Sequence, residues 1–257
     1  MKLDQFENAV EAFEFSIAID EEYSSAYINI SEALIKLEKF DQAKKYLDRS
    51  LSLDGPSPEI YSCLGNVNFY LEDYSTSISF YQKSIKIDQM FKESYFGLGR
   101  SLSKLDKWFE AIHFFKKAYK IDNKNIEYVK SLAYAEFKVG NLVSSIDLYS
   151  KAVEMQPDDY KLSLDFSLIY YESGDIDKAI DIIDQAIEES PGESLLYYRL
   201  VIYLMDAGRY KESINVLESA LSLNFDNHDV LFDFVPNFES QSALIRVINQ
   251  FKNSGNR

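Results

Sequence analysis

Few side chains in this sequence could do covalent or acid–base chemistry. The chain has two histidines, His113 and His228, and one cysteine, Cys63. A metal triad, or a nucleophile with a histidine base, needs several such groups side by side, whereas these two histidines lie far apart along the chain. Two interpretations of Cys63 stay open, a reactive thiol on a binding face and an inert, partly buried thiol; the second is the more common. We therefore expect no enzyme activity, metal or cofactor.

Two further patterns could suggest a ligand, and both fit a helix better. The acidic run Asp175, Asp177, Asp181, Asp184, Glu188 and Glu189 has the spacing of one solvated helix face rather than of a calcium loop. The GLG at residues 97–99 lies inside a predicted helix, so it lacks the strand–turn–helix context of a phosphate-binding loop.

Composition indicates a folded, helical protein. The chain is 46% hydrophobic and has only nine glycines and five prolines in 257 residues, fewer turn signals than a strand-rich chain needs. The net charge of −15 argues against general nucleic-acid binding, although residues 83–138 carry 12 Lys or Arg against 7 Asp or Glu. No run of 18 apolar residues occurs and there is one cysteine, from which we expect a soluble, cytoplasmic protein with no membrane insertion.

A 34-residue repeat organises the chain. In this register position 20 and position 27 are always Ala or Ser, as in Ala43 and Ser50 or Ala111 and Ala118, and position 7 is always large and apolar. Positions 4, 7, 8 and 11 share one helix face, and positions 17, 20, 24 and 27 share a face of a second helix. Each repeat is therefore predicted to be a helical hairpin. Its first residue, position 1, is Ser24, Pro58, Lys92, Ile126, Tyr160 or Ser194.

The turn of each hairpin falls at positions 14–16, where Gly140, Gly174 and Gly208 end a helix. Over residues 1–227 this pattern resembles the tetratricopeptide repeat family. The resemblance implies an all-α fold, an α-solenoid in which antiparallel hairpins form a right-handed superhelix. Asn68 and Glu136 at position 11, and Ser163 at position 4, depart from the family pattern, so looser packing is expected there.

The register also predicts how the chain is divided. Residues 1–23 would form the second helix of an incomplete first repeat, 24–227 six tandem units, and 228–257 C-terminal capping helices and a frayed tail. Phe6, Val10 and Phe13 would then face nothing, from which we expect either a fragment of a longer array or an edge that docks on another copy. After Pro236, residues Ala243, Leu244, Val247, Ile248 and Phe251 share one apolar face, which predicts a terminal cap.

Positions 2, 5, 6, 9, 12 and 13 of the first helices point away from the hairpin interior. In the family these positions line the concave groove, where segments of partner proteins bind. Aromatic rings are frequent among them, as at interface hot spots, but the rings could equally pack between neighbouring helices. The predicted groove residues are Asn66, Phe69, Tyr70, Phe96, Gly97, Arg100, Lys104, Lys130, Tyr134, Phe137, Lys138, Tyr171, Tyr198 and Arg199.

Glycine and charge refine this prediction. Gly99 at position 8 should let the two helices of its hairpin approach closely, whereas Gly97 at position 6 should leave a notch in the groove floor. Arg100, Lys104, Lys130 and Lys138 should gather in a basic floor that attracts an acidic or carboxylate-bearing segment. The lysine and asparagine clamp with which some family members grip a C-terminal carboxylate is not reproduced, since only Asn66 matches.

The leading hypothesis is thus a non-catalytic scaffold that binds a peptide or helix of a partner protein. A docking or regulatory arm of a larger enzyme, and a self-associating structural solenoid, stay open as alternatives.

Overall fold

The computed structural model describes residues 2–234 and 242–254, and the chain divides into two compact units, 1–139 and 140–257. The described residues form helices and no strand, which confirms the all-α fold. The first unit contains α1 (Lys2–Ile19), α2 (Ser24–Lys36), α3 (Phe40–Asp54), α4 (Pro58–Tyr70), α5 (Tyr74–Ile87), α6 (Lys92–Lys104), α7 (Trp108–Ile121) and α8 (Ile126–Lys138). The second contains α9 (Leu142–Met155), α10 (Tyr160–Glu172), α11 (Ile176–Glu189), α12 (Ser194–Asp206), α13 (Tyr210–Leu223), the 3-10 helix η1 (Phe225–Asp229), α14 (Val230–Phe234) and α15 (Ser242–Ser254).

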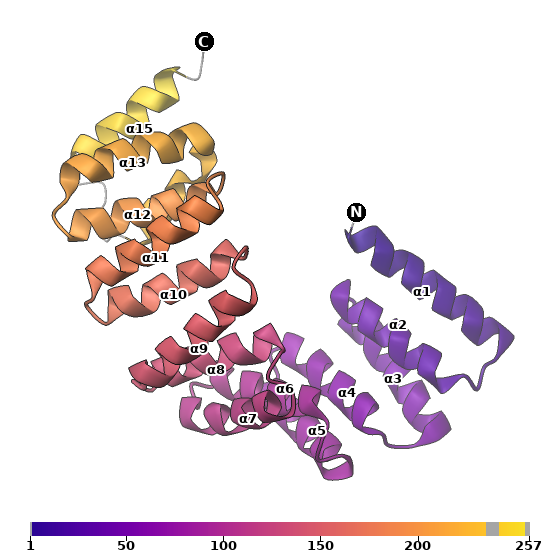
Figure 1. The fold of residues 1–257 in the computed structure, drawn as a ribbon. Helices are drawn as coiled ribbons and strands as arrows, with labels where there is room; N and C mark the ends of the chain where they lie inside the picture. Colours follow the sequence, from indigo (N-terminus) through magenta and orange to yellow (C-terminus); the bar gives the residue numbers. More distant parts are fainter. Residues whose placement is uncertain (1, 235–241, 255–257) are drawn as a thin grey trace. The chain divides into compact units, whose positions relative to one another are not determined.

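The helices follow the 34-residue register. In the six complete repeats the first helix begins at position 1 and the second helix begins at position 17, whereas α1 begins at Lys2, four residues before its position 17. Within each unit antiparallel hairpins stack side by side, for example α4 on α5 and α6 on α7 in the first unit, and α10 on α11 and α12 on α13 in the second (Figure 1). The repeat at residues 126–159 is divided, since α8 belongs to the first unit and α9 to the second.

The turns use one left-handed residue at position 15. Gly140, Gly174 and Gly208 have φ of 82°, 90° and 73°, as the sequence predicts. The first unit places Glu72 at the same position with φ of 61°, and Glu38 and Asp106 are similar at 58° and 57°. A side chain in this conformation costs about 1–2 kcal/mol, so the turns of the first unit are the more strained.

Aromatic rings fill the spaces that the glycines leave. A Cβ on Gly99 would lie 2.6 Å from the Phe115 ring, so the small residue at position 8 admits a side chain of the second helix. The notch predicted at Gly97 is wrong, because a Cβ there would lie 2.2 Å from Tyr81 Cζ. The Tyr81 ring, which is 0% exposed, lies between Gly65 of its own repeat and Gly97 of the next.

Two buried serines of the first unit, Ser77 and Ser101, join neighbouring helices. The Ser77 hydroxyl on α5 donates to the Gly65 carbonyl oxygen on α4 at 2.8 Å and lies 2.9 Å from the Ser101 hydroxyl on α6. Such bonds satisfy the buried hydroxyls while keeping the helices close.

The three residues that depart from the family pattern are all buried. Asn68 is buried and donates to the Leu64 carbonyl oxygen at 2.7 Å. The Glu136 carboxylate is 1% exposed and lies 2.6 Å from Lys116 Nζ. In the second unit Ser163 is also buried, at 4% exposed. These positions are filled rather than open.

The two ends differ in part from expectation. Val10 and Phe13 of α1 are partly buried against the core of α2, α3 and α4, so the expectation that they face nothing is wrong. In the second unit Leu244, Val247 and Ile248 of α15 are buried, and Phe251 is partly buried against the same core. Ala243 is exposed, and Pro236 and residues 255–257 lie outside the described part of the chain.

Candidate functional site

A cleft in the first unit has a volume of about 600 Å³. It lies between α1 and three consecutive first helices, α2, α4 and α6, and we call it the main cleft. Three predicted groove residues line it: Asn66, Tyr70 and Arg100. The other lining residues are Phe6, Ala9, Phe13, Asn29, Glu32, Ala33, Ile35 and Lys36.

Arg100 is held by aromatic rings. Its guanidinium carbon lies 4.1 Å from the centre of the Phe69 ring, and the Tyr70 and Phe96 rings are each 5.8 Å away. Phe69 is only 8% exposed, so it forms a buried support rather than a ligand contact, as the packing alternative proposes. Within residues 2–234 and 242–254 no carboxylate lies within ion-pair distance of Arg100. The guanidinium is thus oriented while its charge stays unpaired.

Tyr81 orients a second polar group of the main cleft. Its hydroxyl donates to Asn66 Oδ1 at 2.7 Å. Burial raises the pKa of Tyr81 well above its usual range, so the phenol keeps its proton and this bond at neutral pH. The Asn66 amide nitrogen has no partner in the described part of the chain and can donate to a ligand.

A smaller acidic pocket adjoins the main cleft. Its volume is about 300 Å³, and it shares Asn29, Glu32 and Asn66 with the main cleft. Glu59 and Glu93 add two further carboxylates from the first turns of α4 and α6. The remaining lining residues are Ser25, Ile28, Ser62, Cys63 and Phe91.

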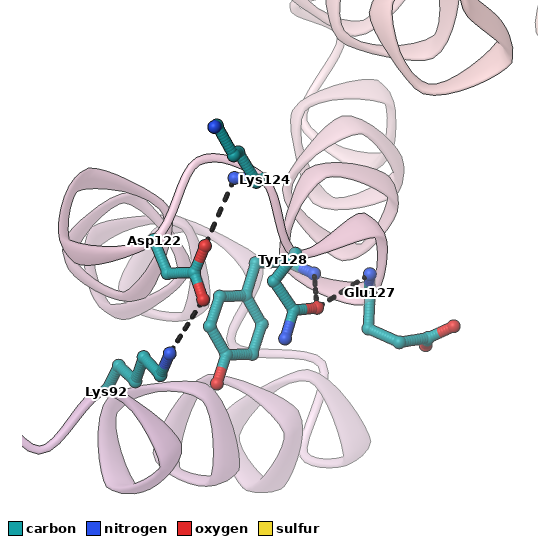
Figure 2. Close-up of polar contacts among 6 residues, drawn as sticks. Lys92, Asp122, Lys124, Glu127 and Tyr128 are labelled. Atoms are coloured by element: carbon teal, nitrogen blue, oxygen red, sulfur yellow. Dashed lines mark hydrogen bonds and ion pairs between the residues drawn. The ribbon is translucent and has the colours of Figure 1, made fainter. Parts of the chain in front are cut away.

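The lysine beside this pocket is already paired. Lys92 Nζ lies 2.6 Å from Asp122 Oδ2, and Asp122 also accepts from the Lys124 amide at 3.2 Å (Figure 2). The Lys92 partner holds the pKa of Asp122 below its usual value, and the same bond raises the pKa of Lys92. Lys92 therefore joins the start of α6 to Asp122, the residue that follows α7.

The other predicted residues of the first unit lie outside the main cleft. Phe96 is half-buried between the Phe115 and Tyr128 rings, 5.8 and 4.7 Å away. Gly97 is buried under Tyr81. Phe137 is half-buried and Lys104 exposed.

The predicted basic floor is not assembled there, since of its members Arg100 alone lines the main cleft. Lys130 Nζ lies 3.1 Å from Glu127. Lys138 lies over the Trp108 and Tyr134 rings, 5.8 and 5.6 Å from their centres. The two lysines therefore have local partners.

In the second unit two of the predicted groove residues contact neighbouring side chains, and the third is buried. Tyr198 is 0% exposed and its hydroxyl donates to the Asn224 carbonyl oxygen at 2.8 Å, so it packs rather than faces a ligand. Tyr171 stacks on Tyr203 at 4.7 Å and donates to Asp206. Arg199 lies 3.8 Å over the Phe234 ring.

Cys63 is a buried thiol. It is 3% exposed, and its Sγ lies 3.7 Å from Glu32 Oε1. Burial, followed by the Glu32 carboxylate, raises the pKa of Cys63 well above its usual range, which keeps the sulfur protonated. Within the described ranges no group of His, Cys, Asp or Glu side chains is placed to hold a metal ion. Among the same residues, no helix combines the length and apolar character that crossing a bilayer requires.

Sequence reasoning missed much of the wall of these two cavities. Glu32 and Lys36 stand at positions 9 and 13, and Glu59 and Glu93 at position 2, all on the face that the register assigns to the groove. The positional rule alone would have included them. The emphasis on aromatic and basic side chains left them out.

Comparison with known proteins agrees with the hairpins. A family model described as tetratricopeptide repeat matches residues 1–66 and 136–201, and a second model of that description matches 92–125 and 195–227. The chain belongs to the tetratricopeptide repeat family. A search of curated proteins gave no match.

Solved structures of tetratricopeptide repeat proteins share the fold. YrrB, described as having an unusual peptide-binding site, is 22% identical over 73% of this chain and 96% of its own, with a TM-score of 0.57. PilF of Pseudomonas aeruginosa is 14% identical over 87% of this chain and 98% of its own, with a TM-score of 0.68. The Cut9–Hcn1 hetero-tetramer includes a chain that is 13% identical over 95% of this chain and 46% of its own, with a TM-score of 0.67.

Proposed function

We propose that this tetratricopeptide repeat chain is a non-catalytic interaction module whose main cleft binds a segment of a partner protein. In this proposal an acidic side chain or a C-terminal carboxylate of that segment contacts Arg100. The observation that carries the proposal is the Arg100 guanidinium, stacked 4.1 Å over Phe69 and without a carboxylate partner among the described residues.

Physical chemistry favours a carboxylate at this place. A guanidinium presents a planar fork of donors that matches a carboxylate, and stacking fixes it before the ligand arrives, so that less side-chain entropy is lost on binding. The Asn66 amide offers a further donor in the same cleft, and Tyr70, 40% exposed, offers an aromatic edge. Arginine and tyrosine are enriched among residues that dominate binding energy.

The similar structures support a binding role in general terms. YrrB is described as a protein with a peptide-binding site, and Cut9 forms an assembly with Hcn1. Neither likeness identifies the partner of this chain.

A peptide selection tests the proposal. A random twelve-residue peptide library displayed on phage is selected on the immobilised chain, and the enriched peptides are synthesised and measured by fluorescence anisotropy. We expect enriched peptides to contain Asp, Glu or a free C-terminus, and Arg100→Gln to weaken them by about tenfold, as for loss of one charge-assisted bond. Lys120→Gln, which removes the same charge from an exposed position of α7, is the matched control and should bind as wild type. Enrichment of no peptide, or equal binding to Arg100→Gln, contradicts the proposal.

Self-association is a second candidate, because α1 carries two large apolar side chains in solvent. Phe15 is 68% exposed and Ile19 is 74% exposed. If this face joins copies, sedimentation velocity should show a concentration-dependent dimer that Phe15→Ser/Ile19→Ser abolishes. A monomer at every concentration contradicts this candidate.

A further inference from the structure

We propose that the acidic pocket binds a basic side chain, lysine or arginine, of the same partner segment whose carboxylate contacts Arg100. The first unit would then recognise a pair of opposite charges at a fixed spacing. This inference rests on the proposed function and adds a specificity element to it.

Three carboxylates of consecutive first helices line the pocket without a cation. Glu32 comes from α2, Glu59 from α4 and Glu93 from α6. None of them has an ion-pair partner among the described residues, and Lys92 beside the pocket is bound to Asp122. All three side chains are exposed, and a cation in the pocket would be attracted by each of them.

An unpartnered hydroxyl in the wall of the pocket is a second feature that points to a ligand. Ser62 lines the pocket, is only 4% exposed, and has no hydrogen-bond partner in the described part of the chain. The Ser62 oxygen can accept a hydrogen bond from an ammonium or guanidinium donor in the pocket. The Phe91 ring, also in the wall, suits a guanidinium face or a lysine stem.

The pocket fits an organic cation better than a metal ion. Its carboxylates come from three helices and form no group placed to hold a metal. A guanidinium or ammonium carries several donors in different directions, so it can reach separated acceptors. A side chain entering a cavity of about 300 Å³ is of the right size.

The spacing of the two charges follows from α6. Glu93 and Arg100 are seven residues apart on this helix, and a rise of about 1.5 Å per residue separates them by roughly 10 Å along its axis. An extended peptide spans about 3.3 Å per residue. The proposed motif is therefore a basic and an acidic residue three positions apart, in either order, in a segment lying extended along α6.

Repulsion between like charges would exclude peptides with the wrong charge pattern. A segment with acidic residues at both places would put a carboxylate among Glu32, Glu59 and Glu93, which costs affinity. The chain, with a net charge of −15, would thus select mixed-charge segments rather than polyacidic ones.

A double-mutant cycle on the peptides selected as above tests the inference. Each peptide, and its version with the basic residue changed to Ala, is titrated into wild type, Glu93→Gln, Arg100→Gln and the control Glu154→Gln, an exposed residue of α9. We expect Lys or Arg three positions from Asp or Glu. We also expect Glu93→Gln to weaken the parent peptide about tenfold and the Ala version less than twofold, and Glu154→Gln to change neither.

Each outcome decides between the two proposals. Dependence on Arg100 without coupling to Glu93, or peptides whose charges are seven positions apart as in a helix, overturns the inference and leaves the proposed function standing. Loss of dependence on Arg100, or failure to select any peptide, overturns both.

Discussion

A single methyl group at Gly97 tests how the first unit is packed. In Gly97→Ala the new Cβ would lie 2.2 Å from Tyr81 Cζ and 2.4 Å from Cε1. Carbon atoms in contact are about 3.5 Å apart, so the ring would have to move by more than 1 Å. It is 0% exposed and already abuts Gly65, where a Cβ would lie 2.6 Å away, so the opposite side offers no room.

The expected loss follows from two opposed terms. Alanine is a better helix former than glycine by about 1 kcal/mol, whereas overpacking a filled core costs about 1–3 kcal/mol. Because the ring is confined on both sides, we take the upper end and expect a net destabilisation of about 2 kcal/mol. For a chain of this size that lowers the melting temperature by roughly 4–8 °C.

Trp108 fluorescence during urea unfolding is the suitable assay. Trp108 is the one tryptophan of the chain and lies in the first unit, so it reports the unit that contains Gly97. Gln82→Ala, at an exposed helical position of α5 in the same unit, is the control and should leave the midpoint nearly unchanged.

A second substitution tests whether the clash with the Tyr81 ring causes the loss of stability. One repeat earlier in the chain, Leu47 is the equivalent of Tyr81 and Cys63 is the equivalent of Gly97. A smaller residue in place of Tyr81 should therefore admit a side chain at position 97. In a Tyr81→Leu background, Gly97→Ala should be neutral or stabilising. Gly97→Ala that leaves the wild-type midpoint unchanged or raises it refutes the packing account.

Three further changes test other parts of the structure. Glu72→Gly removes a left-handed side chain, and it should stabilise the first unit by about 0.5–1 kcal/mol in the same urea assay; a loss of stability would contradict the assigned turn. Lys116→Met removes a cation that lies 2.6 Å from the buried Glu136 carboxylate, and it should lower the free energy of unfolding by about 1–2 kcal/mol, whereas Lys120→Met should lower it by almost nothing. Equal unfolding midpoints for the two variants would show that the pair does not stabilise the fold. Because Cys63 is buried and its pKa is raised, it should react with Ellman's reagent at pH 8 only after unfolding in guanidinium, and prompt reaction of the folded chain would be inconsistent with its burial.

The helices could be predicted from the sequence because several features of the repeat indicate the same register. Small residues at positions 20 and 27 and glycine at position 15 all mark the same register, and helices begin where it places position 1 and position 17. A constant period of this kind depends on neighbouring repeats alone, so it can be read without long-range information.

The repeat pattern in the sequence did not predict how side chains pack between repeats. The Gly97 space depends on Tyr81, which belongs to the previous repeat, and the face of one helix does not tell which ring enters from another. The same limit applies to Phe69, whose ring is buried beneath Arg100, and to Tyr198 in the second unit. Periodicity predicts which way a side chain points but not what covers it.

The candidate site was predicted in outline only. Of the predicted groove residues, Asn66, Tyr70 and Arg100 line the main cleft, and both their positions and their residue types indicate a binding face. The acidic pocket was missed because its glutamates resemble ordinary solvated helix residues in the sequence, and only their convergence from three helices distinguishes them.

A crystal structure of the chain with a selected peptide tests the central claim most directly. The account predicts the peptide in the main cleft, with a carboxylate hydrogen-bonded to the Arg100 guanidinium at about 2.8 Å. A peptide bound on another surface, with Arg100 still stacked on Phe69 and contacting no ligand, would contradict it.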